Sequence, residues 1–198
     1  CRKNSFEPGM TRIPAGSLEI AADGGIWLGS MAGSLTRIDP KTLAGRQVKM
    51  PAVYGLLSDS PNRIWIATVT GMYTINPGDP NAKPEQVASP AFPKAGLRFT
   101  SMSKDLKGDL WATSDQGIFK FDPDGWHAID AGPFGTKADL IAVDWKGNVW
   151  AAGPSQDLMK LRIDGFKVTA AEHIGRPPLM SEEIVSLLVD HRGWLWVG

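Results

Sequence analysis

The chain of 198 residues has a single cysteine, Cys1, and no excess of either charge, with 21 Lys and Arg against 21 Asp and Glu. One cysteine excludes an internal disulfide bond and a metal site built from several thiolates. Nucleic-acid-binding domains usually carry a basic excess or a basic stripe, and neither is present. The sequence also lacks a run of about 18 apolar residues, which a membrane-spanning helix needs. We therefore expect this segment to contact neither nucleic acid nor a membrane.

Common catalytic motifs are absent as well. The sequence has no Gly-x-Ser-x-Gly nucleophile elbow and no Gly-x-Gly-x-x-Gly dinucleotide loop. The segment GPFGTK (132–137) lacks the spacing of a phosphate loop, and we interpret it as an ordinary loop. Asp-Pro-Asp-Gly (122–125) lacks the further oxygen ligands of a calcium loop and is interpreted as a turn. The histidines His127, His173 and His191 are far apart in the chain. We predict no catalytic residue, no cofactor and no metal site.

The positive signal is an internal repeat centred on tryptophan. Five of the eight tryptophans occupy the same place in a recurring segment, 38 to 46 residues apart. The five tryptophans are Trp27, Trp65, Trp111, Trp150 and Trp196. The segments around them are AADGGIWLG (21–29), DSPNRIWIA (59–67), DLKGDLWAT (105–113), DWKGNVWAA (144–152) and DHRGWLWVG (190–198).

Other positions of the repeat indicate tight turns. An Asp stands six residues before the Trp in four copies, at Asp59, Asp105, Asp144 and Asp190. A Gly stands three before it in four copies, at Gly24, Gly108, Gly147 and Gly193. An Asp side chain accepts backbone N–H bonds in a turn, and Gly tolerates positive φ. A second Gly and an Asp-Pro or Asn-Pro follow in the first three copies, and Pro ends a strand because it cannot donate to the ladder.

Each copy therefore predicts four short antiparallel strands, which we place near 97–104, 109–113, 117–122 and 125–130 in the third copy. Such a sheet cannot bury both of its faces alone. Four-stranded units of about 40–45 residues are typical of β-propeller blades, which pack face to face around an axis. We expect the repeat tryptophans to fill the space between blades. A helical alternative at 178–188 is overridden by the repeat from about Ile184.

The sequence thus predicts an all-β chain forming one partial β-propeller over 1–198, with about 4.5 blades of four antiparallel strands. The expected blades lie near 17–50, 54–89, 97–131, 138–171 and 183–198, the last being incomplete. A half-blade leaves an exposed strand edge, so we expect a piece of a larger ring that associates readily when isolated. Cys1 is either an arbitrary start or a lipidated mature N-terminus, and the sequence leaves both open.

The repeat pattern resembles the two-component-regulator propeller repeat. The pieces that carry the resemblance are DGGIWLGSMAGSLTRIDP, NRIWIATVTGMYTINP, KGDLWATSDQGIFKFDP and RGWLWVG, and they span most of 17–198. The resemblance implies the periplasmic or extracellular sensor region of a bacterial membrane receptor of about seven blades. Its histidine kinase or diguanylate cyclase output module would lie outside this chain. The fourth copy departs from the pattern, because AGPSQDLMKLRIDG lacks the second Gly and ends in Asp-Gly.

The resemblance implies binding rather than catalysis. The ligand, a small molecule, a glycan or a protein, would be expected on loops at one end of the ring or at its axis. A homodimer of the full-length receptor is also implied. Two alternatives stay open: a secreted propeller scaffold, and an enzyme similar to streptogramin lyases, whose repeats share the Asp-Gly-x-apolar-Trp core. The residues Arg98, Lys104 and Trp126 are candidates for lining a groove, although no pattern selects them.

Overall fold

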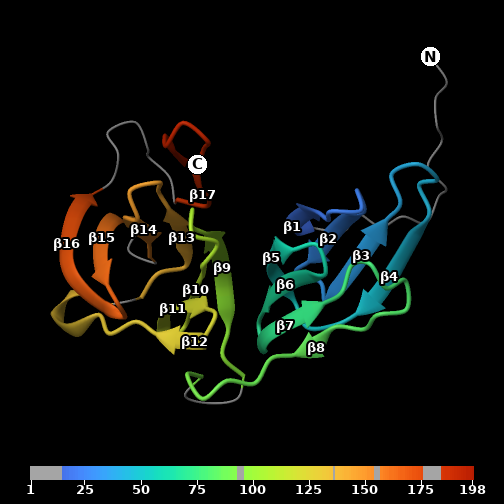
Figure 1. Cartoon of the computed structure of the whole chain (residues 1–198), viewed down its shortest axis with the longest axis horizontal. Coiled ribbons are helices and arrows are strands. Elements are labelled where there is room, and N and C mark those ends of the chain that lie inside the picture. The colour runs from blue at the N-terminus through green and yellow to red at the C-terminus, as the bar shows by residue number, and fades with distance from the viewer. Residues whose placement is uncertain (1–14, 93–95, 136, 154–156, 176–183) are drawn as a thin grey trace.

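The computed structural model describes residues 15–92, 96–135, 137–153, 157–175 and 184–198 (Figure 1). These residues form eighteen β-strands and a single 3₁₀ turn, Gly132–Phe134. In the described part of the chain, no helix is long and apolar enough to cross a membrane. The structure is all-β, as predicted from the repeat.

The strands form antiparallel sheets in which spatial order follows sequence order. The first sheet contains β1 (Ala15–Ile20), β2 (Ile26–Ser30), β3 (Ser34–Ile38) and β4 (Gly45–Lys49). The second contains β5 (Val53–Ser60), β6 (Arg63–Thr68), β7 (Gly71–Ile75) and β8 (Glu85–Gln86). The third contains β9 (Phe99–Lys104), β10 (Leu110–Ser114), β11 (Gly117–Asp122) and β12 (Gly125–Ala128). The fourth contains β13 (Leu140–Val143), β14 (Val149–Ala152), β15 (Leu158–Asp164) and β16 (Lys167–Gly175). The fifth contains β17 (Leu187–Val189) and β18 (Leu195–Val197).

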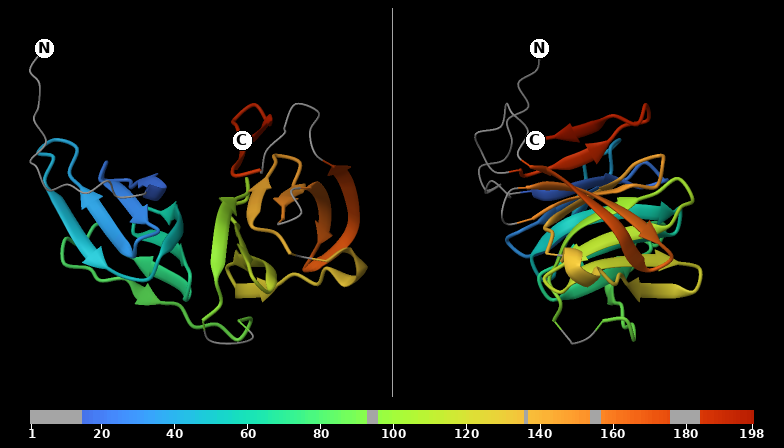
Figure 2. Two further views of the ribbon diagram at one scale, coloured as in Figure 1. Left: turned by 180° about the vertical axis from the view of Figure 1, so that it is seen from behind. Right: turned by 90° about the vertical axis from the view of Figure 1, so that its left-hand side faces the viewer.

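The sheets are arranged as an arc around one axis. In Figure 1 the strands β1, β5, β9, β13 and β17 surround the centre, and β4, β8, β12 and β16 lie at the rim. Successive innermost strands contact one another, and Figure 2 shows the same arrangement from behind. In the third sheet, each observed strand begins and ends within two residues of the predicted positions. The fourth sheet forms despite its irregular repeat, and β16 is nine residues long.

The core lies between neighbouring sheets. Trp27, Trp65 and Trp111 are 4%, 2% and 5% exposed, and each is in a cluster with apolar residues of the following sheet. The contact between the second and third sheets is the richest in aromatic rings, with Trp65 lying 4.8 Å from Phe121 and 5.3 Å from Trp126 in edge-on geometry. Edge-on aromatic pairs add to the free energy of burial. These three tryptophans thus fill the spaces between sheets, whereas Trp196 in the fifth sheet is 52% exposed.

The innermost strands are joined by side chains rather than by strand pairing. Ser17 Oγ accepts a hydrogen bond from Leu56 N at 2.8 Å, and Glu19 Oε1 accepts one from Ser58 N at 2.9 Å. Between the third and fourth sheets, two serines of β9 make the same kind of bond. Ser101 Oγ accepts from Ile141 N at 3.3 Å and Ser103 Oγ accepts from Val143 N at 3.1 Å. These bonds satisfy backbone donors that face the neighbouring sheet.

In the third, fourth and fifth sheets, the turn between the first two strands depends on the repeat Asp. Asp105 Oδ1 accepts from the backbone N–H groups of Lys107 and Asp109, at 2.9 and 3.0 Å. The glycine in these turns adopts positive φ, which a residue with a Cβ rarely does. The values are +81° at Gly24, +89° at Gly108, +78° at Gly147 and +81° at Gly193.

Candidate ligand-binding site

The three residues considered from the sequence do not line one groove. Arg98 precedes β9, whereas Lys104 ends the same strand and donates from Nζ to the Asp59 carbonyl at 3.1 Å. Trp126 is 7% exposed and belongs to the core between the second and third sheets. Lys104 is exposed as well but lies at the other end of β9, so Arg98 is the candidate at the end where loops connect one sheet to the next.

The histidines are also dispersed. His127 stacks on Phe166 with ring centroids 4.1 Å apart, and its Nε2 lies 3.2 Å from Asp122 Oδ1. His173 Nε2 lies 3.7 Å from Asp157, while His191 belongs to the turn between β17 and β18. Within the described ranges, no three His, Cys, Asp or Glu side chains gather as a metal site would require. The Asp122 carboxylate instead accepts the Asp124 N–H and closes the turn between β11 and β12.

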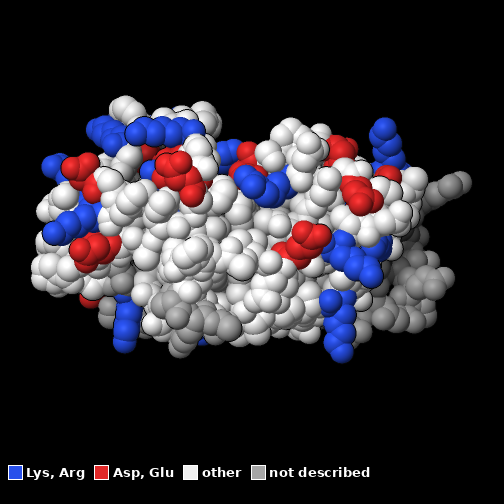
Figure 3. Space-filling view, turned by 60° about the horizontal axis from the view of Figure 1, so that its bottom comes forward, with Lys and Arg blue, Asp and Glu red and all other residues white. Residues whose placement is uncertain are grey.

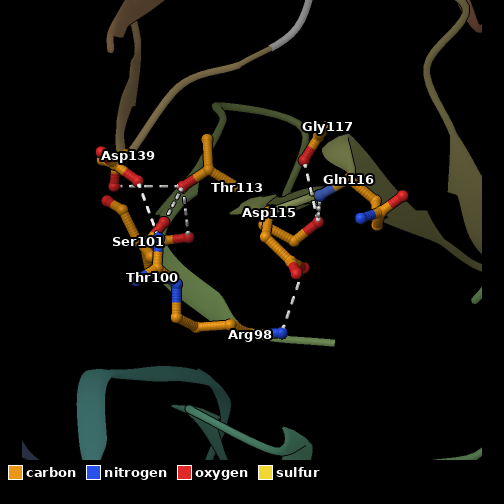
Figure 4. A network of polar contacts seen from close by, with 9 residues as sticks. Arg98, Thr100, Ser101, Thr113, Asp115, Gln116, Gly117 and Asp139 are labelled. Atoms are coloured by element: carbon orange, nitrogen blue, oxygen red, sulfur yellow. Dashed lines mark hydrogen bonds and ion pairs between the residues drawn. The ribbon is translucent and has the colours of Figure 1, made fainter. Parts of the chain in front are cut away.

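A network of polar contacts joins the third and fourth sheets beside Arg98 (Figure 4). Thr113 is fully buried, and its hydroxyl lies 3.0 Å from Thr100 Oγ1. The same hydroxyl lies 3.3 Å from the Asp139 carbonyl oxygen and 3.4 Å from that of Ser101. A buried hydroxyl with several partners holds its surroundings in one arrangement. The network therefore fixes the positions of the exposed residues that lie above it.

Arg98 lies between two carboxylates at the surface of this network. Its backbone N–H donates to Asp115 Oδ1 at 3.2 Å, and Asp115 N donates to the Arg98 carbonyl at 3.0 Å. Its guanidinium is 3.7 Å from Asp139 Oδ1, and both side chains are 45% exposed. An exposed pair at this distance contributes little to stability. Its groups are free to exchange partners with a bound ligand.

A hollow of about 620 Å³ opens beside Asp115. Its walls combine hydrogen-bonding side chains with apolar ones, and consist of Asp115, Gln116, Phe134, Gly135, Lys137 and Met159. We call Arg98, Asp139 and these lining residues the loop-end site. Concave surfaces with a few convergent polar groups among apolar ones are typical of small-molecule sites. The arrangement can bind a polar ligand, and its described residues include no histidine or cysteine.

The loop-end site rests on a turn that the second Gly of the repeat predicted, but sequence reasoning missed the hydroxyl that closes it. Ser114 accepts from Gln116 N at 3.0 Å and donates to the Gly117 carbonyl at 3.3 Å. Ser30 and Thr68 occupy the same place, three residues after the repeat Trp, and accept from Ala32 N and Thr70 N. A Ser or Thr three residues after the repeat Trp in three copies is the sequence signal that could have predicted these hydrogen bonds.

Charge is mixed on one face of the molecule. On the face shown in Figure 3, acidic and basic side chains are interspersed among neutral ones. This face presents no extended field of one sign, which long-range steering of a charged partner would need.

No protein-family model and no curated protein matches the sequence. Solved structures do match. The extracellular domain of BT4673 from B. thetaiotaomicron, assigned to the one-component or hybrid two-component systems, aligns with a TM-score of 0.72 and 18% identity. That of BT3049 from the same organism, assigned to the hybrid two-component systems, gives 0.67 and 17%. A catalytically inactive virginiamycin B lyase from Staphylococcus aureus, solved with quinupristin, gives 0.65 and 14%.

These alignments and the arc of four-stranded sheets decide the fold. The chain is part of a β-propeller. The alignments cover 92% of this chain for BT4673, and 91% for BT3049 and the lyase. The chain spans 25% of the BT4673 and BT3049 extracellular domains and 68% of the lyase. The propeller therefore shares its fold with extracellular domains assigned to one-component or hybrid two-component systems, the relationship that the repeat resemblance predicted.

Proposed function

We propose that this propeller is part of the extracytoplasmic ligand-sensing region of a bacterial membrane-bound signalling receptor. The observation that carries the proposal is the alignment of nearly the whole chain with the extracellular domains of BT4673 and BT3049. The receptor's output module, a histidine kinase or a diguanylate cyclase, lies outside this chain. The protein acts on the periplasmic or extracellular side, and the full-length receptor is a homodimer.

The mechanism is a population shift rather than bond chemistry. A ligand changes the signalling state only by binding one arrangement of the receptor more tightly than another. The loop-end site suits this role because Arg98 and Asp139 come from different sheets, the third and the fourth. A ligand that exchanges partners with this ion pair changes the contact between two blades. The ligand class is a small polar molecule, a glycan fragment or a segment of a protein.

Reading the coding frame on both sides of this chain is the first test of the receptor. We expect further tryptophan repeats, a membrane-spanning helix and a kinase or cyclase module in the same frame. A complete ring followed directly by a stop codon would favour the secreted-scaffold alternative instead.

The loop-end site is tested in the full-length receptor with a transcriptional reporter and a panel of glycan fragments and amino acids. Arg98→Ala and Lys137→Ala should shift the half-maximal ligand concentration upwards, because each removes a cation from the site. Lys107→Ala, in the turn at the other end of β9, is the matched control and should leave the response unchanged. Equal responses in all three variants would place the ligand elsewhere on the receptor.

An enzyme is the second candidate, and it is favoured by the alignment with virginiamycin B lyase. Incubation of the chain with quinupristin, followed by chromatography, tests it directly. We expect the compound to remain intact, because the described residues contain no group of three His, Cys, Asp or Glu side chains that could hold a metal ion. Conversion that depends on a divalent cation would replace the sensor proposal.

A further inference from the structure

Every contact between neighbouring blades has the same direction. The repeat Trp of one blade clusters with the two residues that flank the repeat Trp of the next blade. The successive contacts are Trp27 with Ile64 and Ile66, Trp65 with Leu110 and Ala112, Trp111 with Val149 and Ala151, and Trp150 with Leu195 and Val197. Each blade thus has a tryptophan face and an aliphatic face, because successive side chains on a strand point to opposite sides.

The aliphatic face of the first blade has no blade against it in the described structure. It consists of Leu18, Ile20, Ile26 and Leu28, since β1 pairs Leu18 with Leu28 and Ile20 with Ile26. Leu18 and Ile20 are 58% and 62% exposed. In the second blade, Leu56 occupies the place of Leu18 and is only 7% exposed beneath Trp27.

The tryptophan face of the fifth blade is open in the same way. Leu188 and Trp196 lie opposite each other in β17 and β18, and are 61% and 52% exposed. Trp196 Nε1 donates to Asp190 Oδ2 at 3.0 Å, the bond that also holds Trp111 and Trp150. The exposed indole is therefore already oriented as in the packed blades, which lowers the entropy lost on docking.

We propose that these two faces bind each other between molecules, so that the 198-residue chain associates head to tail with a second copy of itself. A second copy is the occupant because it brings the one surface that matches each open face: a tryptophan face for the first blade and an aliphatic face for the fifth. Two faces of the same kind do not match, so the interface is heterologous, and such interfaces generate rings or open chains. The inference is independent of the proposed sensor function. In a longer polypeptide that supplies further blades, those blades meet the same faces, so the 198-residue chain is the form to test.

The test uses one charged substitution at each end. Ile20→Lys blocks the aliphatic face and Trp196→Lys blocks the tryptophan face. Sedimentation velocity over a hundredfold range of concentration should show association of the unaltered chain and monomers of each variant. Leu106→Lys is the matched control, because Leu106 is 80% exposed in a turn and belongs to neither face, and it should associate normally. Far-UV circular dichroism checks that every variant is folded.

Mixing the two monomeric variants is the decisive step. Ile20→Lys retains its tryptophan face and Trp196→Lys retains its aliphatic face, so an equimolar mixture should form dimers that grow no further. A monomeric unaltered chain, a mixture that stays monomeric, or association that survives both substitutions would overturn the proposal. Should either variant fail to fold, Leu18→Lys and Leu188→Lys provide a second pair at the same faces.

Discussion

Trp150 donates its indole N–H to the carboxylate of Asp144, six residues earlier, at 3.1 Å. The same bond joins Asp105 to Trp111 at 3.0 Å and Asp190 to Trp196 at 3.0 Å. In each copy the other carboxylate oxygen accepts two backbone N–H groups of the turn. One acidic side chain therefore fixes both the turn and the indole that packs between blades.

Replacing Asp144 by Ala should lower the free energy of unfolding by about 1–3 kcal/mol, because it leaves the Trp150 indole and the turn N–H groups without their acceptor. Urea denaturation followed by circular dichroism measures the effect. Asp164→Ala is the matched control, since Asp164 is an exposed residue at the end of β15. A loss no larger than in this control would contradict the role assigned to the Asp144 carboxylate.

Stability should fall in acid. Burial acts to raise the pKa of Asp144, but hydrogen bonds from Asn148 and Trp150 outweigh it and hold that pKa below its ordinary value. The Trp196 indole and the turn N–H groups lower the pKa of Asp190 in the same way. Carboxyls with a lowered folded-state pKa stabilise the fold fully above the unfolded-state pKa of about 4 and progressively less below it.

Unfolding in urea at a series of pH values tests this expectation. The free energy of unfolding should be level above about pH 4.5 and decline below about pH 4. The Asp144→Asn variant should show a shallower decline, because one of the responsible groups is gone. An unchanged acid profile in that variant would show that other carboxyls control the transition.

Gly29 should not tolerate a side chain. A Cβ at this position would meet the side chain of Val53 in the second blade, and Gly29 is buried. Overpacking of this kind costs about 1–3 kcal/mol. Gly29→Ala should therefore lower the unfolding midpoint in urea. Gly45→Ala should change it little, since its Cβ would have only the Arg37 carbonyl oxygen within reach, at 3.9 Å. Equal midpoints for both variants would show that the first two blades can separate freely.

The tryptophans should differ sharply in their contribution to stability. Trp65→Ala removes one ring from the aromatic cluster between the second and third blades and should lower the free energy of unfolding by about 3–5 kcal/mol. Trp194→Ala removes a ring that is 61% exposed and should cost less than about 1 kcal/mol. Thermal unfolding of both variants compares the two positions. A small effect at Trp65 would mean that those blades are held mainly by other contacts.

Much of the fold could be predicted because the same pattern of strands and turns recurs in several copies of the repeat. One Asp-Gly turn is ambiguous, but five copies with Trp in register leave few other folds. The strands of the third blade lie within two residues of their predicted positions. Two copies depart from the repeat, and in each the structure shows a different set of contacts around the turn. Ala21 removes the carboxylate from the first copy, where Asp23 accepts from Gly25 N and pairs with Arg37 instead. In the second copy Asp59 pairs with Arg63, and the buried Trp65 indole N–H has no hydrogen-bond partner among the described residues.

The candidate site could not be predicted in the same way. Arg98, Asp115 and Asp139 come from three separate segments, and none of them belongs to the repeat. Their proximity depends on how the third and fourth blades pack, which no local spacing encodes. Lys104 and Trp126 show the converse, because these two residues, considered together with Arg98 from the sequence, occupy the far end of β9 and the core.

The serine and glutamate bonds between innermost strands have a consequence for hydrogen exchange. The amide protons of Leu56, Ser58, Ile141 and Val143 are held by oxygens of the neighbouring blade rather than by their own sheet. They can exchange with solvent as soon as two blades part, even while every sheet stays intact. Amides in the strand ladders exchange only when the sheet itself opens. These four amides are therefore built-in reporters of blade separation, and their exchange rates distinguish opening of the arc from unfolding of its parts.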